Sequence, residues 1–173
     1  MSNLEKIQKG MRVFQILTKI VLVFACVGLV LTSVAAILVA AGVLTAENQF
    51  LHFLSATAEM SKGQLTASLT AAACSLLLGG ACTAYAYRYF TLELKEGTPF
   101  TNAGANRIKQ LGILTVVLSF VSTLVRDVLY EAAGLPEWSR ADFSGGIVPG
   151  ILLILLAVVV RYGAELEEKS KGR

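Results

Sequence analysis

The sequence predicts an all-α integral membrane protein in which four helices cross the bilayer and pack as a bundle. Of the 173 residues, 55% are hydrophobic, which is more than soluble domains contain. The apolar residues form four uncharged runs, at 20–44, 65–87, 110–125 and 143–160. A helix needs about 20 such residues to cross the hydrocarbon layer. The ten-residue alternation typical of a membrane β-barrel is not visible in the sequence.

The four spans fall at about residues 18–44, 65–88, 108–130 and 145–162 of a single domain, residues 1–173. The first apolar run is longer than the about 7–15 apolar residues of a signal peptide, so we expect a retained helix. Before it, Ser2 to Glu5 have the S-x-x-E form of a capping box, which predicts a helix that begins almost at once. This lead-in either lies along the membrane surface or extends the first span.

Basic residues set the predicted orientation. Of the 15 Lys and Arg residues, 12 lie before the first uncharged run, between the second run and the third, or after the fourth. Because positive charge stays on the cytoplasmic side, we expect both termini and the second loop in the cytoplasm, with the chain in a bacterial inner membrane. The basic face suits the anionic lipids of the inner leaflet. No long basic run with interleaved aromatic residues favours direct binding of nucleic acid.

Small residues recur every four positions in the second span, at Ala71, Ser75, Gly79 and Thr83. Such a stripe lets the backbones of two helices approach closely in lipid. We therefore expect this stripe to pack against another helix. That helix belongs either to the same chain or to a second copy in a homo-oligomer.

The segment between the second and third spans has the residues of a helical hairpin. Gly97 can end a helix in the left-handed conformation, Pro99 prevents the helix from resuming, and Thr101 can cap the next one. No helix breaker precedes Gly97 after Leu65, so we expect the hairpin to protrude into the cytoplasm. It is not a phosphate-binding loop, because the G-x-x-x-x-G-K-[ST] sequence is missing.

Two motifs in the chain resemble those of a known family. GTPFT at 97–101, followed by RIKQLG at 107–112, resembles the central signature of a family of small bacterial four-helix inner-membrane proteins of unknown function. VVVRYGAELEE at 158–168 resembles its C-terminal signature, although the acid and Asn that usually follow the Thr are replaced here by NAG. Since members are often encoded beside a small helix-turn-helix regulator, the resemblance implies such a regulator as a partner. It implies no catalytic residue.

Residues that could carry out chemistry are not grouped. Cys26, Cys74 and Cys82 all fall inside predicted spans, where a thiol acts as a small apolar side chain. His52 is the only histidine, and no nucleophile–base pair or pair of facing carboxylates can be assembled. We therefore expect no catalytic, cofactor-binding or metal site, and a protein that is not an enzyme.

Arg126, Asp127 and Glu131 lie at the outer end of the third span and form one candidate binding site. Charges at membrane depth are costly and usually functional. The alternative is that Arg126 reaches the outer head groups with its long side chain while Asp127 lies in water.

The second candidate is a partner-binding surface on the cytoplasmic side. It consists of Gly97, Pro99, Phe100, Arg107, Glu165 and Glu168. We expect Arg107 to meet the acidic cluster at 165–168, the alternative being a solvated helix end in which Arg161 pairs with Glu165. This surface favours a small regulatory or sensor protein that engages a cytoplasmic partner. The alternative function is an oligomeric transporter or channel component.

Overall fold

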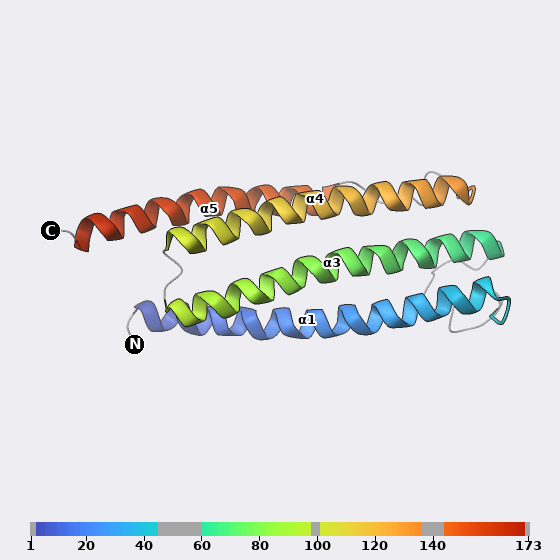
Figure 1. Cartoon of the computed structure of the whole chain (residues 1–173), viewed down its shortest axis with the longest axis horizontal. Helices are drawn as coiled ribbons and strands as arrows, with labels where there is room; N and C mark the ends of the chain where they lie inside the picture. Colours follow the sequence, from blue (N-terminus) through green and yellow to red (C-terminus); the bar gives the residue numbers. More distant parts are fainter. Residues whose placement is uncertain (1–2, 45–59, 98–100, 136–143, 172–173) are drawn as a thin grey trace. The chain divides into compact units, whose positions relative to one another are not determined.

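The computed structural model describes residues 3–44, 60–97, 101–135 and 144–171. These residues form four helices and no strand (Figure 1): α1 (Asn3–Ala40), α3 (Lys62–Glu96), α4 (Asn102–Ala132) and α5 (Ser144–Lys171). Each helix is long and apolar enough to cross a membrane. The prediction of an all-α chain with four such helices is confirmed.

The helices are longer than the bilayer requires. The 35 residues of α3 extend over about 52 Å at about 1.5 Å per residue, whereas the hydrocarbon layer is about 30 Å thick. The uncharged run at 65–87 is long enough by itself to cross that layer, and residues 88–96 continue the helix beyond it. Likewise α1 is one unbroken helix from Asn3 to Ala40, so the lead-in extends the first span.

Local sequence explains both sides of the turn between α3 and α4. Gly97 has a φ of 80° and its N–H donates to the Glu93 carbonyl at 3.0 Å, as expected for the residue that follows a helix. Thr101 Oγ1 accepts a hydrogen bond from the Gly104 N–H at 2.8 Å, which is the predicted N-cap. Pro99 and Phe100, which the sequence assigned to the same turn, lie outside the described residues.

The chain divides into two compact units, and every helix except α5 contributes to both. Unit 1 contains Met1–Leu22, Ala81–Leu118 and Ser144–Arg173, and unit 2 contains Val23–Gly80 and Ser119–Phe143. Each unit has its own cluster of buried side chains. The core of unit 1 consists of Tyr89, Ala105, Ile108, Ala157 and Val160. The core of unit 2 consists of Ala35, Val39, Leu65 and Leu69.

Glycines of α4 and α5 bring these two helices close together within unit 1. A Cβ added at Gly112 would lie 2.8 Å from the Gly150 carbonyl oxygen, and one added at Gly150 would lie 2.9 Å from the Gly112 carbonyl oxygen. Side chains at these positions would force the two backbones apart. The two helices therefore pack through backbone atoms, as small residues allow in lipid.

The stripe predicted on the second span has a mixed outcome. Ala71 is buried, and the Ser75 hydroxyl lies 2.9 Å from the Ser122 hydroxyl of α4, within unit 2. Thr83 lines a cavity described below. A Cβ at Gly79, however, would meet no atom within 4 Å. The close backbone approach expected at Gly79 is found instead in unit 1, at the glycines of α4 and α5.

Apolar side chains also cover much of the surface, as expected for helices whose solvent is lipid. On α1 the exposed large residues include Phe24, at 72% exposure, and Ile37, at 67%. On α5 they include Val158 and Val159. In water these faces would be costly, so their exposure agrees with the membrane assignment.

Candidate functional site

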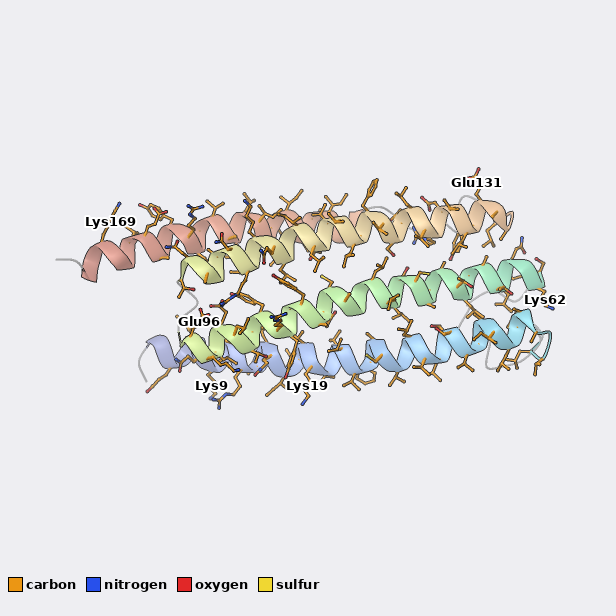
Figure 2. The ribbon with its side chains drawn as sticks, viewed as in Figure 1. Lys9, Lys19, Lys62, Glu96, Glu131 and Lys169 are labelled. Carbon is orange, nitrogen blue, oxygen red and sulfur yellow. The ribbon has the colours of Figure 1, made fainter. Side chains whose placement is uncertain are left out.

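A cluster of charged side chains in unit 1 lies at the turn between α3 and α4. Arg107 Nη1 donates to Glu93 Oε1 at 3.0 Å, and Arg107 Nη2 donates to Glu96 Oε1 at 2.6 Å. The two acids lie one helical turn apart on α3, and Arg107 lies in the second turn of α4, so the short turn brings all three together. We call this group the hairpin clamp, and Figure 2 labels Glu96 in it.

Glu93 is the unusual member of the hairpin clamp, because its side chain is fully buried. One of its oxygens is bound by Arg107, while the other, Oε2, has no hydrogen-bond partner within the part of the chain that the structure describes. Burial raises the pKa of Glu93, and the hydrogen bond from Arg107 offsets part of that rise. By contrast, the hydrogen bond from Arg107 lowers the pKa of the more exposed Glu96. Both groups lie beyond the uncharged run of α3.

The N-terminal part of α1 is fixed to the same end of α3. Gln8 Nε2 donates to the Gly97 carbonyl oxygen at 2.9 Å, and Gln15 Nε2 donates to Thr91 Oγ1 at 2.9 Å. The rings of Phe14 and Phe90 stack with their centroids 6.0 Å apart. The capping box predicted a helical lead-in here, but nothing in the sequence pattern identified the glutamines as the residues that hold the hairpin.

A polar hollow of about 250 Å³ lies beside the hairpin clamp, between α3 and α4. Its lining residues, all in unit 1, are Tyr85, Arg88, Tyr89, Leu92, Arg107 and Gln110. The Tyr85 hydroxyl donates to Gln110 Oε1 at 2.6 Å. Arg88 is exposed. The sequence pattern alone does not mark Tyr85, Arg88 and Gln110 as a site, because each is an ordinary residue for the end of a membrane helix.

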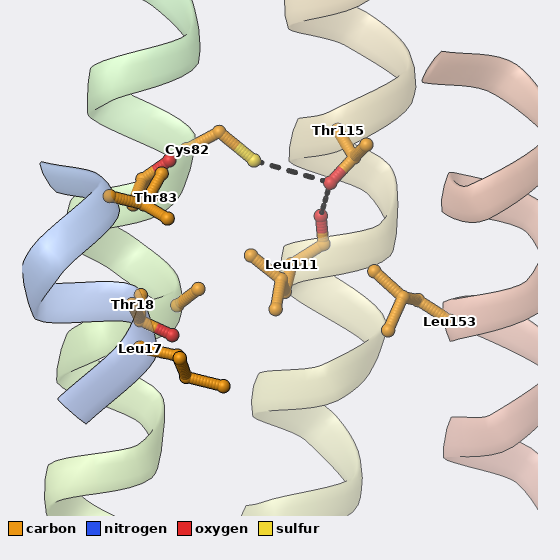
Figure 3. A pocket seen from close by; sticks show the side chains of 9 residues that line it. Leu17, Thr18, Cys82, Thr83, Leu111, Thr115 and Leu153 are labelled. Carbon is orange, nitrogen blue, oxygen red and sulfur yellow. Dashed lines mark hydrogen bonds between the residues drawn. The ribbon is translucent and has the colours of Figure 1, made fainter. Parts of the chain in front are cut away.

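A second, more apolar cavity of about 350 Å³ is lined by residues of all four helices within unit 1 (Figure 3). Its lining residues are Leu17, Thr18, Val21, Cys82, Thr83, Ala86, Leu111, Thr115 and Leu153. The Thr115 hydroxyl donates to the Leu111 carbonyl at 2.8 Å. Cys82 Sγ lies 3.3 Å from the same hydroxyl oxygen, so the thiol is the donor in that contact. Cys82 thus acts as a satisfied, weakly polar core residue.

Among the described side chains, Arg107 forms no contact with the acidic tail. Arg107 is held by the two acids of α3, and Glu165 pairs with Arg161 of its own helix at 3.6 Å. The hairpin acids are nearer along the chain and lie on the adjacent helix, so they take the guanidinium. The side chain of Glu168 lies outside the described residues. Of the described members of the predicted partner-binding set, Gly97 and Arg107 lie at the turn, and Glu165 pairs on its own helix.

The charges at the other end of α4 make a looser group. Arg126 Nη2 and Asp127 Oδ1 are 4.0 Å apart, and the two side chains are 19% and 40% exposed. Glu131 is exposed (Figure 2). These three residues belong to unit 2.

Within the described residues, no group of three or more His, Cys, Asp or Glu side chains could hold a metal ion. The three cysteines are free thiols. His52 lies outside the described residues.

Comparison with protein-family models, with curated proteins and with solved structures finds no match to this chain. The resemblance carried by residues 97–101, 107–112 and 158–168 therefore stays a prediction. So does the helix-turn-helix regulator that it implies as a partner. The function has to be argued from the geometry of the hairpin clamp and of the two cavities.

Proposed function

We propose that the chain is a non-enzymatic regulatory or sensor protein of the bacterial inner membrane that engages a cytoplasmic protein. In this proposal both termini are cytoplasmic, and the partner binds the hairpin surface, residues 95–109, together with the C-terminal tail. A small helix-turn-helix regulator is one such partner. The observation that supports the proposal is the hairpin clamp, in which Arg107 is bound by Glu93 and Glu96.

The hairpin clamp gives the hairpin a fixed conformation before any partner arrives. A fully buried carboxylate is costly unless it is paired. The burial of Glu93 therefore strongly favours the conformation in which Arg107 pairs with it. Gln8 adds a further bond to the turn through the Gly97 carbonyl. A surface that is already ordered loses less conformational entropy on binding, which favours its use in recognition.

The outside of this hairpin carries side chains suited to a protein partner. Lys95, Asn106 and Lys109 are exposed on either side of the turn. In the tail, Tyr162 and Leu166 are 63% and 49% exposed, next to the exposed carboxylate of Glu165. Aromatic and apolar side chains with charged neighbours are typical of binding surfaces.

Site-specific photo-crosslinking in cells tests the proposal. A crosslinking side chain at Asn106 should capture a soluble protein, whereas one at the exposed Val117, in the apolar run of the same helix, should not. Arg107→Glu should weaken the Asn106 crosslink while the protein still inserts. Adding Glu96→Arg should restore part of it, because that substitution returns an opposite charge to the turn. An Asn106 crosslink that is equally strong in Arg107→Glu, or equal at both sites, would contradict a hairpin docking surface.

The orientation has a separate test. Single cysteines at Asn106 and Gly63 are compared in intact cells and in inverted membrane vesicles, using a thiol reagent that does not cross membranes. We expect Gly63→Cys to react in intact cells and Asn106→Cys to react in inverted vesicles. Labelling of Asn106→Cys in intact cells would reverse the proposed orientation.

A transporter or channel component is the second candidate, and the apolar cavity of unit 1 favours it. Its walls carry the hydroxyls of Thr18, Thr83 and Thr115, which could line a path for a small neutral solute. The residues lining it include no carboxylate, amine or guanidinium, so a charged solute fits poorly. The rate at which proteoliposomes swell in small neutral solutes tests this candidate. Swelling that the Ala86→Phe substitution abolishes would support a path through the cavity. Proteoliposomes that swell no faster than protein-free vesicles would exclude such a path.

A further inference from the structure

The polar hollow between α3 and α4 is rich in hydrogen-bond donors. Its two guanidinium groups, those of Arg88 and Arg107, can only donate. The amide oxygen of Gln110 already accepts from the Tyr85 hydroxyl, which leaves the NH₂ group of Gln110 as a further donor. A ligand in this hollow must therefore supply several acceptor oxygens.

The two guanidinium groups differ in how firmly they are held. Arg107 is fixed by Glu93 and Glu96, which neutralise its charge but leave three of its five N–H groups without a bond in the hairpin clamp. Arg88 is exposed and makes no hydrogen bond or ion pair within the described residues. Arg88 thus supplies the uncompensated positive charge of the hollow, while Arg107 supplies preoriented donors.

The hollow also lies at a particular depth along both helices. Tyr85 and Arg88 flank the end of the uncharged run of α3, at residue 87, and Gln110 begins the apolar run of α4. Arg and Tyr at the ends of spanning segments lie at the level of the lipid head groups. The phosphate groups of the bilayer are therefore the acceptor-rich anions nearest to this hollow.

We propose that the polar hollow is a specific site for a phosphate group, supplied by the head group of an anionic phospholipid. The phosphate oxygens accept from Arg88, from the unused N–H groups of Arg107 and from the Gln110 amide. Leu92 and the ring of Tyr89 form the apolar part of the wall, which suits the glycerol carbons beside the phosphate. This inference does not depend on the protein partner proposed above.

Lipid retention by the full-length protein tests the site. The protein is reconstituted into nanodiscs that contain equal amounts of phosphatidylglycerol and phosphatidylcholine, released, and examined by native mass spectrometry. Wild type should retain phosphatidylglycerol preferentially. Arg88→Gln should lower that preference about tenfold, the factor that one charged hydrogen bond is worth. Lys109→Gln removes the same charge from an exposed position outside the hollow and should leave the preference unchanged.

A second variant tests the donor argument without removing a cation. Gln110→Glu keeps an acceptor for the Tyr85 hydroxyl but replaces the free NH₂ donors with a carboxylate oxygen. It should lower retention of phosphatidylglycerol at least as much as Arg88→Gln. The melting temperatures of Arg88→Gln and Gln110→Glu in detergent should equal that of wild type, which shows that the fold is intact. Lipid retention is then compared between proteins of equal stability.

A parallel arm distinguishes a lipid from a soluble source of phosphate. Inorganic phosphate alone is added to protein in a neutral detergent, and the melting temperature is measured. Phosphate could raise the melting temperature of wild type but not of Arg88→Gln, while wild type retains both lipids equally. The hollow would then bind soluble phosphate rather than a lipid head group, which overturns the lipid assignment. If Arg88→Gln, Gln110→Glu and Lys109→Gln all behave as wild type in both arms, the hollow is not an anion site.

Discussion

The two units use different means to hold helices together. Unit 1 has polar contacts between helices along its whole described length: Gln8 to Gly97, Gln15 to Thr91, Cys82 to Thr115, Tyr85 to Gln110, and Arg107 to Glu93 and Glu96. In unit 2 the described contacts of this kind include Ser75 with Ser122 and Gln64 with the Gly134 carbonyl. The core of unit 2 is aliphatic and consists of Ala35, Val39, Leu65 and Leu69.

This difference shows where the sequence specifies one arrangement of the helices. In lipid, apolar surfaces gain little by leaving one apolar environment for another, so close backbone packing and interhelical hydrogen bonds set which helix faces meet. Unit 1 has close backbone packing as well as interhelical hydrogen bonds. It also contains the polar hollow and the apolar cavity. We therefore expect the geometry of unit 1 to be more sensitive to single substitutions than that of unit 2.

Loss of the hairpin clamp should have the largest effect. Arg107→Gln leaves the buried Glu93 without its cation, which costs about 3–5 kcal/mol when a buried pair is broken. The melting temperature in detergent should fall strongly, whereas Lys109→Gln, on the same helix and exposed, should change it little. A fall no larger than that of Lys109→Gln would show that Glu93 is not paired as described.

The same variant has a defined pH dependence. Because burial raises the pKa of Glu93, the folded state takes up a proton more readily than the unfolded state as pH falls. Protonation removes the charge that Arg107→Gln leaves unpaired. The difference in melting temperature between Arg107→Gln and wild type should therefore narrow from neutral towards mildly acidic pH, and a difference that widens would contradict the assignment.

The glycine contact between α4 and α5 should rank next. Gly112→Ala places a methyl group against the Gly150 carbonyl, and such overpacking costs about 1–3 kcal/mol. Gly79→Ala is the matched control in the stripe of α3, where a Cβ meets no atom within 4 Å. That control should be neutral, or more stable by up to about 1 kcal/mol through helix propensity. Equal losses in the two variants would remove the distinction between these glycines.

Arg126 of unit 2 should matter less to stability than Arg107 of unit 1. Arg126 Nη2 lies 4.0 Å from Asp127 Oδ1, which is beyond hydrogen-bond distance. The Asp127 side chain is 40% exposed, although its Oδ1 is buried, whereas the Glu93 side chain is fully buried. A pair of this kind is worth about 0–1 kcal/mol. Arg126→Gln should lower the melting temperature far less than Arg107→Gln, and the reverse order would overturn the comparison of the two units.

The hydroxyl pair of unit 2 should give the smallest effect. A double-mutant cycle with Ser75→Ala and Ser122→Ala should yield a coupling of about 0.6 kcal/mol, the usual size for an interhelical hydrogen bond in a membrane. The same cycle in unit 1 uses Tyr85→Phe and Gln110→Leu. A coupling in unit 2 that exceeds the one in unit 1 would show that polar contacts are no more important in unit 1.

The sequence by itself determined the helices, because helix formation and membrane crossing depend on local properties. Uncharged runs of sufficient length, the left-handed Gly97 and the capping Thr101 act through residues only a few positions away. These features predicted the four helices and the turn at which α3 ends. These local features predict the same helices and the same turn regardless of which helix faces pack together.

Only the tertiary structure decided which residues meet. Charge alone allowed Arg107 to pair with the tail or with α3, and the turn favours acids 11 and 14 residues away, because a shorter loop costs less entropy to close. Likewise, nothing local separates Gly112 from Gly79 among the 15 glycines. A glycine permits close approach, but the partner backbone that uses it, here at Gly150, is fixed by the packing of whole helices.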